Sequence, residues 1–385
     1  MERESGTKQV VTPDMVKQKV NTVFYATRSK LVAARYGNPS KNIRVIAVMG
    51  ISGKTTTACF IAELLKESDH TVALLTNRGI EIKGNYAEKD YGKDVATLQN
   101  ILKSAKQKQI EFLVIEVTPR MVDRHIIDGI QIDTVVVTNC DARVEPSIRK
   151  MIEKQINYVV LPHYNTTLLQ GMLMSEHKII SFGDSIDADS TIDKVMLYRK
   201  GTEVRLVIDN QTTIDVATHL VGQANAYNVS AAVATAYVLG VDLDLVANGI
   251  ARLQSVTSNY EYVSTDQTYD IIVDGADNNE SLLSVITSAR ELSKRRLIAV
   301  VASDGMSDDA LSAATKLTDR LIVIDTPDQT TTITGAEAVL SAKDATAKAL
   351  RGAKKGDTVL LIGGMFSVRQ SSGKTLADVL IQGAE

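Results

Sequence analysis

Apolar residues along the chain alternate between short β-branched runs and longer stretches with helical spacing. Runs that are apolar on both faces predict buried strands. In the first half of the chain these runs are Arg44–Met49, Thr71–Thr76, Phe112–Val117 and Thr134–Thr138. The helices expected between them cover 54–66, about 94–107 and about 120–128. Such an alternation indicates a mostly parallel sheet with helices on both faces.

Two other patterns flank this block. Apolar residues at near-helical spacing predict one helix from Pro13 to about Arg35, whereas residues 1–12 are polar and are expected to be loose. After a strand that starts near Lys178, short strands at about 194–199 and 203–208 suggest an antiparallel flap. The helices expected after the flap lie at about 225–239 and 242–252.

The alternation of strands and helices restarts near Tyr269. The strands expected in this last block are 269–274, 296–302, 321–325 and 358–362. Of the three helices expected between them, the first ends near 292, and the other two cover 308–317 and 342–352. The fold class predicted is α/β. We expect an N-terminal helical extension over 1–42, a central domain over 43–255 with a mostly parallel sheet, and a C-terminal Rossmann-like α/β domain over 256–385.

Composition narrows the class of protein. The 385 residues are 44% hydrophobic and 23% charged, which is ordinary for a soluble globular chain of two or three domains. A net charge of −3 leaves no overall basic field for a nucleic acid, and no apolar run approaches the ~18 residues of a membrane span. Cys59 and Cys140 lie far apart and belong to no CxxC pair. Without an apolar leader at its start, the chain is expected to be cytoplasmic.

The strongest chemical signal is Gly50-Ile-Ser52-Gly53-Lys54-Thr55-Thr56, between a predicted strand and a predicted helix. Glycines let the backbone fold around phosphate oxygens, and the free N–H groups at a helix start point at an anion. Lys54 would neutralise phosphate charge, and the Thr55 hydroxyl would complete a Mg²⁺ shell. The spacing departs from GxxxxGK[ST], because Gly50 is only three residues before Gly53. Its place between strand and helix still favours a nucleotide-binding P-loop.

Glu116 lies at the carboxyl end of a predicted buried strand, where ligands collect in open α/β sheets. A carboxylate in this position is suited to hold Mg²⁺ near the phosphates. The alternative is an N-cap for the helix that follows Pro119, a role that Thr118 would fill equally well. The P-loop supplies a reason for a cation and therefore favours the metal interpretation.

Other polar residues at element ends keep two interpretations. Asn225 opens a predicted helix and is a good N-cap, and Asn228, one turn later, would face the same way toward a purine edge. From these residues alone the capping interpretation is favoured. For Asp274 and Asp277, which end a strand, helix capping and contact with a nucleotide ribose are equally supported. The five histidines show no metal-ligand spacing.

Taken in order, these motifs resemble the Mur ligases, most closely the MurE type, over about residues 43–370. The residues that carry the resemblance are Gly50 to Thr56, Glu116-Val117, Thr138-Asn139, Gly222 with Asn225 and Asn228 followed by Ala231-Ala232, Val273-Asp274-Gly275-Ala276-Asp277, and Gly356-Asp357-Thr358-Val359-Leu360. No single motif is decisive, but six of them occur in the family's order.

The resemblance implies an ATP-dependent carboxylate–amine ligase that acts through an acyl phosphate in the synthesis of peptidoglycan stem peptides. Its substrates would be a muramoyl peptide or a related acid and an amino acid, with ATP and Mg²⁺. The resemblance implies catalytic roles for Lys54 and Glu116 and metal binding by Thr55 and Glu116. The residues expected to contact the nucleotide are Gly50, Ser52, Gly53, Lys54, Thr55, Thr56, Asn225, Asn228 and Asp274.

Several positions depart from the family pattern. Only about 42 residues precede the first strand, so the family's N-terminal UDP-binding domain is expected to be missing or reduced to one helix. A protein partner is a candidate to replace it. This chain has Pro119-Arg120 in place of the family's Ser-His, and Asp141-Ala142 in place of its Asp-His at the second metal. It has Ser258-Asn259 in place of the linker Gly-Arg, and Asp325-Thr326-Pro327-Asp328 in place of Asp-Asn-Pro-Arg. The late Gly-Lys-Gly-His-Glu has become Gly363–Ser367. Neither Lys150 nor Lys154 can be assigned to the family's carbamylated lysine.

These departures leave two interpretations of function. In the first the chain is a ligase, on the family's acid or on a carrier- or lipid-linked acid, with Arg120, Arg143 or Arg149 compensating for the second metal. In the second it is a catalytically degenerate ATP-binding protein that serves as a regulatory or partner subunit. The retained Lys54, Thr55 and Glu116 favour the ligase. A generic P-loop motor or kinase would leave the motifs of the last block unexplained.

Overall fold

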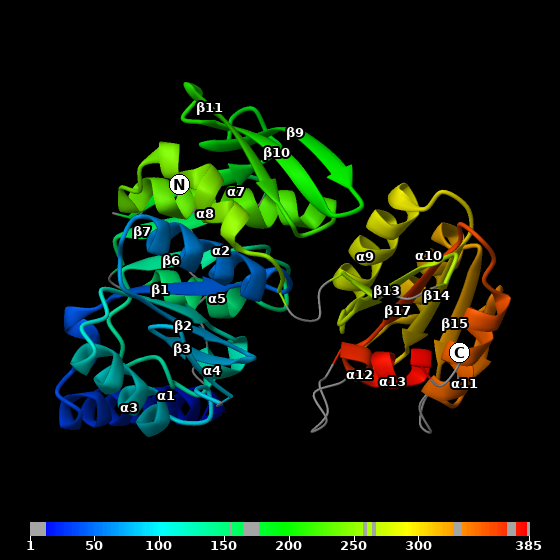
Figure 1. Ribbon diagram of the computed structural model, residues 1–385. Coiled ribbons are helices and arrows are strands. Elements are labelled where there is room, and N and C mark those ends of the chain that lie inside the picture. The colour runs from blue at the N-terminus through cyan, green and yellow to red at the C-terminus, as the bar shows by residue number, and fades with distance from the viewer. Residues whose placement is uncertain are drawn as a thin grey trace, which may run out of the picture.

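The chain forms two α/β units that lie side by side, each built around one sheet (Figure 1). The computed structural model describes residues 13–88, 90–154, 156–164, 177–256, 260–263, 267–325, 333–367 and 375–382, with side chains from residue 23 onward in the first helix. The predicted α/β class is confirmed. The predicted boundary near 255 comes just before residues 257–259, which lie outside the described residues.

The sheet of the first unit has eleven strands in the order β11-β10-β9-β8-β7-β6-β1-β5-β2-β3-β4. From β9 to β2 all neighbours are parallel, and the strands at both edges are antiparallel. The strands are β1 (Arg44–Met49), β2 (Val72–Thr76), β3 (Gly79–Ile82), β4 (Asn85–Ala87), β5 (Phe112–Glu116), β6 (Thr134–Val137), β7 (Tyr158–Pro162), β8 (Lys178–Gly183), β9 (Ser190–Tyr198), β10 (Gly201–Ile208) and β11 (Thr212–Thr218).

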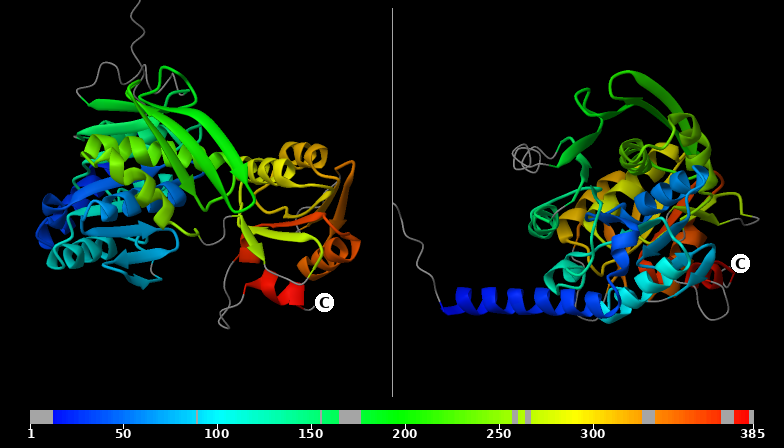
Figure 2. Two further views of the ribbon diagram at one scale, coloured as in Figure 1. Left: turned by 45° about the horizontal axis from the view of Figure 1, so that its top comes forward. Right: turned by 90° about the vertical axis from the view of Figure 1, so that its left-hand side faces the viewer.

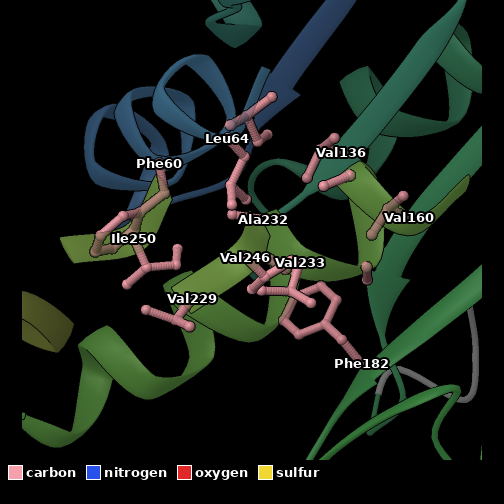
Figure 3. Packing of buried hydrophobic residues seen from close by; sticks show 14 of the residues in the cluster. Phe60, Leu64, Val136, Val160, Phe182, Val229, Ala232, Val233, Val246 and Ile250 are labelled. Carbon is pink, nitrogen blue, oxygen red and sulfur yellow. The ribbon is translucent and has the colours of Figure 1, made fainter. Parts of the chain in front are cut away.

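Helices cover both faces of this sheet because its central strands are apolar on both sides. The helices of one face are α2 (Lys54–Glu67), α7 (Gln223–Leu239) and α8 (Val246–Arg252); those of the other are α3 (Val95–Gln107), α4 (Pro119–Asp123) and α5 (Glu145–Ile152). Figure 3 shows the first layer from close by, with Phe60 and Leu64 of α2 beside Ala232 of α7 and Ile250 of α8. All four side chains are fully buried. This packing holds α2 against α7 and α8, and nearer the starts of α2 and α7 the Thr57 hydroxyl donates to Oδ1 of Asn228 at 3.3 Å.

The second unit is a six-stranded sheet in the order β12-β13-β17-β14-β15-β16, parallel except for β12. Its strands are β12 (Glu261–Val263), β13 (Asp270–Asp274), β14 (Leu297–Ala302), β15 (Arg320–Ile324), β16 (Ala336–Val339) and β17 (Thr358–Ile362). Its helices are α9 (Asn279–Leu292), α10 (Asp308–Leu317), α11 (Ala342–Gly352), α12 (Gly364–Ser367) and α13 (Leu376–Gln382). The predicted Rossmann-like alternation is confirmed.

The helix α1 (Pro13–Arg35) forms as predicted, and its N-terminal part projects from the body of the molecule (Figure 2). Near its C-terminal end the Ser29 hydroxyl donates to the His125 carbonyl at 2.6 Å, and Ala33 is buried against the first unit. A 3₁₀ turn, η1 (Pro39–Asn42), then leads into β1.

Two predicted helices are wrong in extent. The helix expected over 120–128 ends at Asp123, because His125 adopts a left-handed backbone with φ 57° and its ring bonds Asp128 at 2.7 Å. The expected antiparallel strands are confirmed as β9 and β10. In addition, β9 pairs with β8 and extends the central sheet, and β11 adds a third antiparallel strand. The helix expected over 242–252 is the 3₁₀ turn η2 (Leu243–Leu245) followed by α8.

Candidate functional site

A cavity of about 440 Å³ lies between the two units. On one side it is lined by the loops that follow β1, β2, β5 and β6 and by the first turn of α7. On the other side it is lined by the segment from Asp274 to Ser288, at the end of β13 and along α9. The carboxyl ends of parallel strands are where ligands bind in open α/β sheets. The volume falls in the range of small-molecule sites.

The loop after β1 has the backbone of a phosphate-binding loop. Gly50 and Gly53 have φ values of 143° and 75°, and Gly53 is the N-cap of α2. A Cβ on Gly50 would lie 2.1 Å from the Thr138 hydroxyl, and one on Gly53 would lie 2.3 Å from Oδ1 of Asn228. Glycine is therefore required at both positions for conformation and for space. The Asn139 side chain holds the loop by accepting the Ile51 N–H at 2.7 Å.

Thr55 and Glu116 meet at one end of this loop, and Lys54 points back into the loop. The Thr55 hydroxyl donates to Oε2 of Glu116 at 3.0 Å, and the same oxygen accepts the Asn77 N–H at 3.1 Å. Lys54 donates to the Ile51 carbonyl at 2.8 Å, inside the loop that it follows. Glu116 is only 2% exposed. The structure thus brings the predicted hydroxyl and carboxylate together at the edge of the cavity.

The N-cap of α4, the alternative role considered for Glu116, is Thr118. The Thr118 hydroxyl accepts the Met121 N–H at 3.4 Å at the start of α4. The capping interpretation of Asn225 is wrong, because α7 begins one turn earlier and its N-cap is Gly222. Asn225 instead donates to the Val221 carbonyl at 2.9 Å. Its Oδ1 accepts from Asn228 at 3.1 Å, so the two predicted asparagines form one pair on the cavity wall.

Asp274 reaches the cavity from the second unit. Its carboxylate accepts the Tyr260 N–H at 2.7 Å and the Ala276 N–H at 2.8 Å, whereas the N-cap of α9 is Asn278. Burial raises the pKa of Asp274 to about 7, an effect that the two N–H donors and the charge of Arg78 oppose. Asp277 is exposed at the rim. Of the two aspartates, only Asp274 is buried in the wall of the cavity.

The raised pKa of Asp274 predicts a pH dependence of stability. Between about pH 4 and pH 7 the folded chain holds this proton while the unfolded chain releases it, so the free energy of unfolding falls as the pH rises. The fall amounts to up to roughly 4 kcal/mol. Urea unfolding across this range should show a smaller fall for Asp274→Asn than for the wild type. The control Asp277→Asn should keep the wild-type slope, and equal slopes in all three proteins would contradict the prediction.

Three side chains in the site were not singled out from the sequence as cavity residues. Asn139 donates to Glu280 of α9 at 2.8 Å and so joins the two units. Asn77 and Arg78 follow β2 and line the cavity beside Glu116. The signal that would have found them is the rule applied to Glu116, because β2 is also a parallel strand whose carboxyl end faces the cavity.

The arginines proposed as substitutes for the second metal lie elsewhere. Arg143 pairs with Asp141 at 2.6 Å and Arg149 with Glu145 at 2.6 Å, while Arg120 is exposed. None of the three lines the cavity.

Within the described ranges no group of three His, Cys, Asp or Glu side chains is arranged to hold a metal ion. Lys150 and Lys154 pair with Asp123 and Asp128. The replaced linker pair 258–259 and residues 326–328 of the replaced Asp-Asn-Pro-Arg motif lie outside the described residues, as do residues 165–176.

In the part of the chain that the structure describes, no helix is both long and apolar enough to cross a membrane.

A phosphate-binding loop after the first strand, and a second α/β unit that closes the same cavity, define a two-unit P-loop protein. Family models give the particular class: the Mur ligase middle domain matches residues 48–143, and the Mur ligase glutamate ligase domain matches residues 260–365. The chain belongs to the Mur ligase family.

Individual relatives are distant. The chain is 24% identical to a UDP-N-acetylmuramoyl-L-alanyl-D-glutamate–2,6-diaminopimelate ligase of Bacillus velezensis, over 91% of this chain and 79% of that one. It is 26% identical to the ligase of the same name from Bacillus cereus, over 71% of this chain but only 59% of the relative. Against that relative and several others, the chain thus spans about three fifths of their length.

Solved structures support the fold. Folylpolyglutamate synthase of Mycobacterium tuberculosis, complexed with ADP, superposes with a TM-score of 0.71 at 16% identity and covers 88% of this chain and 91% of its own. The MurF ligase of Thermotoga maritima, also in complex with ADP, gives 0.69 at 17% identity over 94% and 84%. At sequence identities of 16% and 17%, these superpositions show that the fold is shared and show nothing more.

Proposed function

We propose that this protein is an ATP-dependent carboxylate–amine ligase that acts through an acyl phosphate in peptidoglycan stem-peptide synthesis. One observation carries the proposal: Lys54, Thr55 and Glu116 of the first unit and Asp274 of the second line the same cavity. The names of the relatives in Bacillus, diaminopimelate ligases, support a muramoyl dipeptide as the acid and an amino acid as the amine. With these substrates, the reaction would belong to the cytoplasm.

The P-loop fits the phosphates of ATP. Its glycines have the positive φ values of a tightly folded loop, and the residues at the start of α2, where N–H groups are free to bind an anion, line the cavity. In this proposal Gly50, Ser52, Gly53 and Thr56 form the cradle. The pair Asn225 and Asn228 offers amide groups to the adenine, and Asp274 offers its carboxylate to the nucleotide from the second unit.

The residues present also fit a magnesium ion. Mg²⁺ in nucleotide sites is held by few protein oxygens together with phosphates and water, so no cluster of three acids is needed. The Thr55 hydroxyl and the buried Glu116 carboxylate, 3.0 Å apart, are the oxygens that would hold it. When bound, the ion would neutralise charge on the phosphates. Mg²⁺ is therefore part of the proposal.

In the proposed reaction a carboxylate oxygen of the acid attacks the γ-phosphorus of ATP. The bond from this phosphorus to the bridging oxygen breaks, and ADP leaves with the electron pair. The amine then attacks the acyl carbon, phosphate leaves, and the amine loses a proton. Phosphoryl transfer of this kind depends on positioning and charge stabilisation. Lys54 supplies the positive charge at the terminal phosphate, and closure of the two units excludes water from the acyl phosphate.

Replacing Glu116 with glutamine tests the magnesium proposal. Glutamine keeps a carbonyl oxygen that can accept from Thr55 and from the Asn77 N–H, so the fold should survive. We expect the Mg²⁺ concentration needed for half-maximal phosphate release to rise at least about tenfold, because the carboxylate charge is gone. Phosphate release is measured with ATP, the muramoyl dipeptide and diaminopimelate. An unchanged Mg²⁺ requirement would remove Glu116 from the metal site.

The second candidate function is an ATP-binding partner or regulatory protein without turnover. The observation that favours it is the second-metal segment, where Ala142 carries no ligating atom and Asp141 is paired with Arg143. The same assay separates the two candidates. Phosphate release that requires both the acid and the amine supports the ligase, whereas MgATP binding without release on any acid tested supports the partner.

We also propose that the domains follow the boundaries 1–42, 43–255 and 256–385, and that a protein partner contacts α1. Val23, Phe24 and Leu31 of this helix are each more than 60% exposed, which is unusual for apolar side chains of this size. A partner that covers them would protect α1 from proteolysis in cell extract. If the helix is cleaved equally in extract and as purified protein, the partner is excluded.

A further inference from the structure

The charges around the cavity are unequal. Among the described residues that line it, the cationic side chains are Lys54 and Arg78. The carboxylates that line it are Glu116, Asp274, Asp277 and Glu280. Lys54 belongs to the P-loop and has a role there. Arg78 has no role in the function proposed above.

Arg78 is held without a partner of its own. Among the described residues its guanidinium makes no hydrogen bond and no ion pair. Only its backbone is bonded: the N–H donates to the Thr76 hydroxyl, and the carbonyl accepts the Tyr86 hydroxyl. Burial lowers the pKa of Arg78, while the charges of Glu116 and Asp274 act in the opposite direction. A partly buried cation without a hydrogen-bonded partner is costly, so the fold retains a group that an anionic ligand would satisfy. The planar guanidinium fork matches the geometry of carboxylates and phosphates.

The position of Arg78 in the strand order indicates which anion it would bind. The strand order β1-β5-β2 places the P-loop after β1, Glu116 after β5 and Arg78 after β2. Adjacent strands are about 4.8 Å apart, so β2 lies roughly 10 Å from β1. Arg78 is therefore beyond Glu116 as seen from the P-loop. A nucleotide whose terminal phosphate is held by Lys54 would leave Arg78 facing the group on the far side of that phosphate.

We propose that Arg78 binds the reacting oxyanion of the acid substrate, the carboxylate that accepts the phosphoryl group. This inference rests on the ligase function proposed above and assigns the acid-binding position within the same cavity. Arg78 holds the carboxylate on the side of the γ-phosphorus away from the leaving ADP. Asp274 and Glu116 line the same cavity as Arg78. The chemistry that it recognises is an oxyanion with two oxygens that can accept from the guanidinium fork, whether carboxylate or phosphate.

The test uses the full chain saturated with MgADP and two oxyanion probes. The variants are Arg78→Gln, Arg78→Lys and the control Arg124→Gln, an exposed arginine outside the cavity. Inorganic phosphate is the first probe, because it needs no knowledge of the substrate, and UDP-N-acetylmuramoyl-L-alanyl-D-glutamate is the second. Affinities are measured by calorimetry. MgATP affinity and the melting temperature are measured for the same proteins.

Arg78→Gln should weaken phosphate binding at least about tenfold, the loss of one charge-assisted bidentate contact, and Arg78→Lys should lose less. MgATP affinity should stay within about twofold in every variant, which a misfolded chain would not allow. The acid should lose affinity in parallel with phosphate. Unchanged phosphate affinity, a wild type that binds no phosphate, or an equal loss of MgATP affinity would each overturn the proposal.

The outcomes for the two proposals can be told apart. If the wild type binds phosphate through Arg78 but forms no amide, the oxyanion site stands and the ligase function fails. If Arg78→Gln weakens phosphate binding but leaves a measurable affinity for the acid unchanged, Arg78 holds the phosphoryl group, and the assignment to the substrate carboxylate is overturned.

Discussion

Replacing Lys54 with alanine should reduce substrate-dependent phosphate release by at least about 10²-fold, the cost of removing one preorganised charge from a phosphoryl-transfer site. Among the described residues the side chain bonds only the Ile51 carbonyl of its own loop, so its loss should leave the fold intact. Release is measured with ATP, Mg²⁺, the muramoyl dipeptide and diaminopimelate, and MgATP affinity by calorimetry. Both quantities should fall in the variant.

Lys103→Ala is the matched control, because this lysine is exposed on α3 and lies outside the cavity. It should keep the wild-type rate and affinity. A Lys54→Ala protein that binds MgATP as tightly as the control would mean that the P-loop does not hold the phosphates.

Gly53→Ala should abolish MgATP binding and destabilise the first unit. Gly53 has φ 75°, and a Cβ there would lie 2.3 Å from Oδ1 of the buried Asn228. Gly84 has nearly the same φ, 74°, but a Cβ there would meet nothing within 4 Å. Gly84→Ala should therefore cost only the conformational strain, about 1 kcal/mol. Gly53→Ala should cost a further ~1–3 kcal/mol for the overlap. Urea unfolding measures both.

A second substitution tests the cause of that difference. Asn228→Ala removes the oxygen that the new methyl group would meet, so the double variant Gly53→Ala/Asn228→Ala should be less destabilised than the sum of the two single variants. Strict additivity would show that the contact with Asn228 is not the source of the cost. Equal stability of Gly53→Ala and Gly84→Ala would lead to the same conclusion.

Much of the fold can be predicted from the sequence because the central strands are apolar on both faces. Runs such as Arg44–Met49 and Thr358–Ile362 are buried almost throughout and lie where the pattern predicts them. The strand β7 carries an equally apolar run, Tyr158–Pro162, but it is not among the strands predicted from the sequence. Edge strands such as β4 are exposed, and their pattern carries little signal.

The residues of the candidate site also differ in how well the sequence predicts them. A binding motif that lies in one continuous segment, such as the P-loop, can be predicted from the sequence. Contacts that depend on how strands are ordered are not: Arg78 and Glu116 are far apart in the chain and become neighbours only because β2 and β5 pair in parallel. The capping interpretation of Asn225 is wrong because the helix begins at Gln223, where a glycine rather than a polar side chain caps it.

The most direct test of the ligase proposal is to follow oxygen from the acid into phosphate. UDP-N-acetylmuramoyl-L-alanyl-D-glutamate with ¹⁸O in its glutamate carboxylates is incubated with ATP, Mg²⁺ and diaminopimelate, and the phosphate released is analysed by mass spectrometry. An acyl phosphate requires that each phosphate carry one oxygen from the carboxylate, so the account predicts one ¹⁸O per phosphate. Phosphate released without ¹⁸O would contradict it.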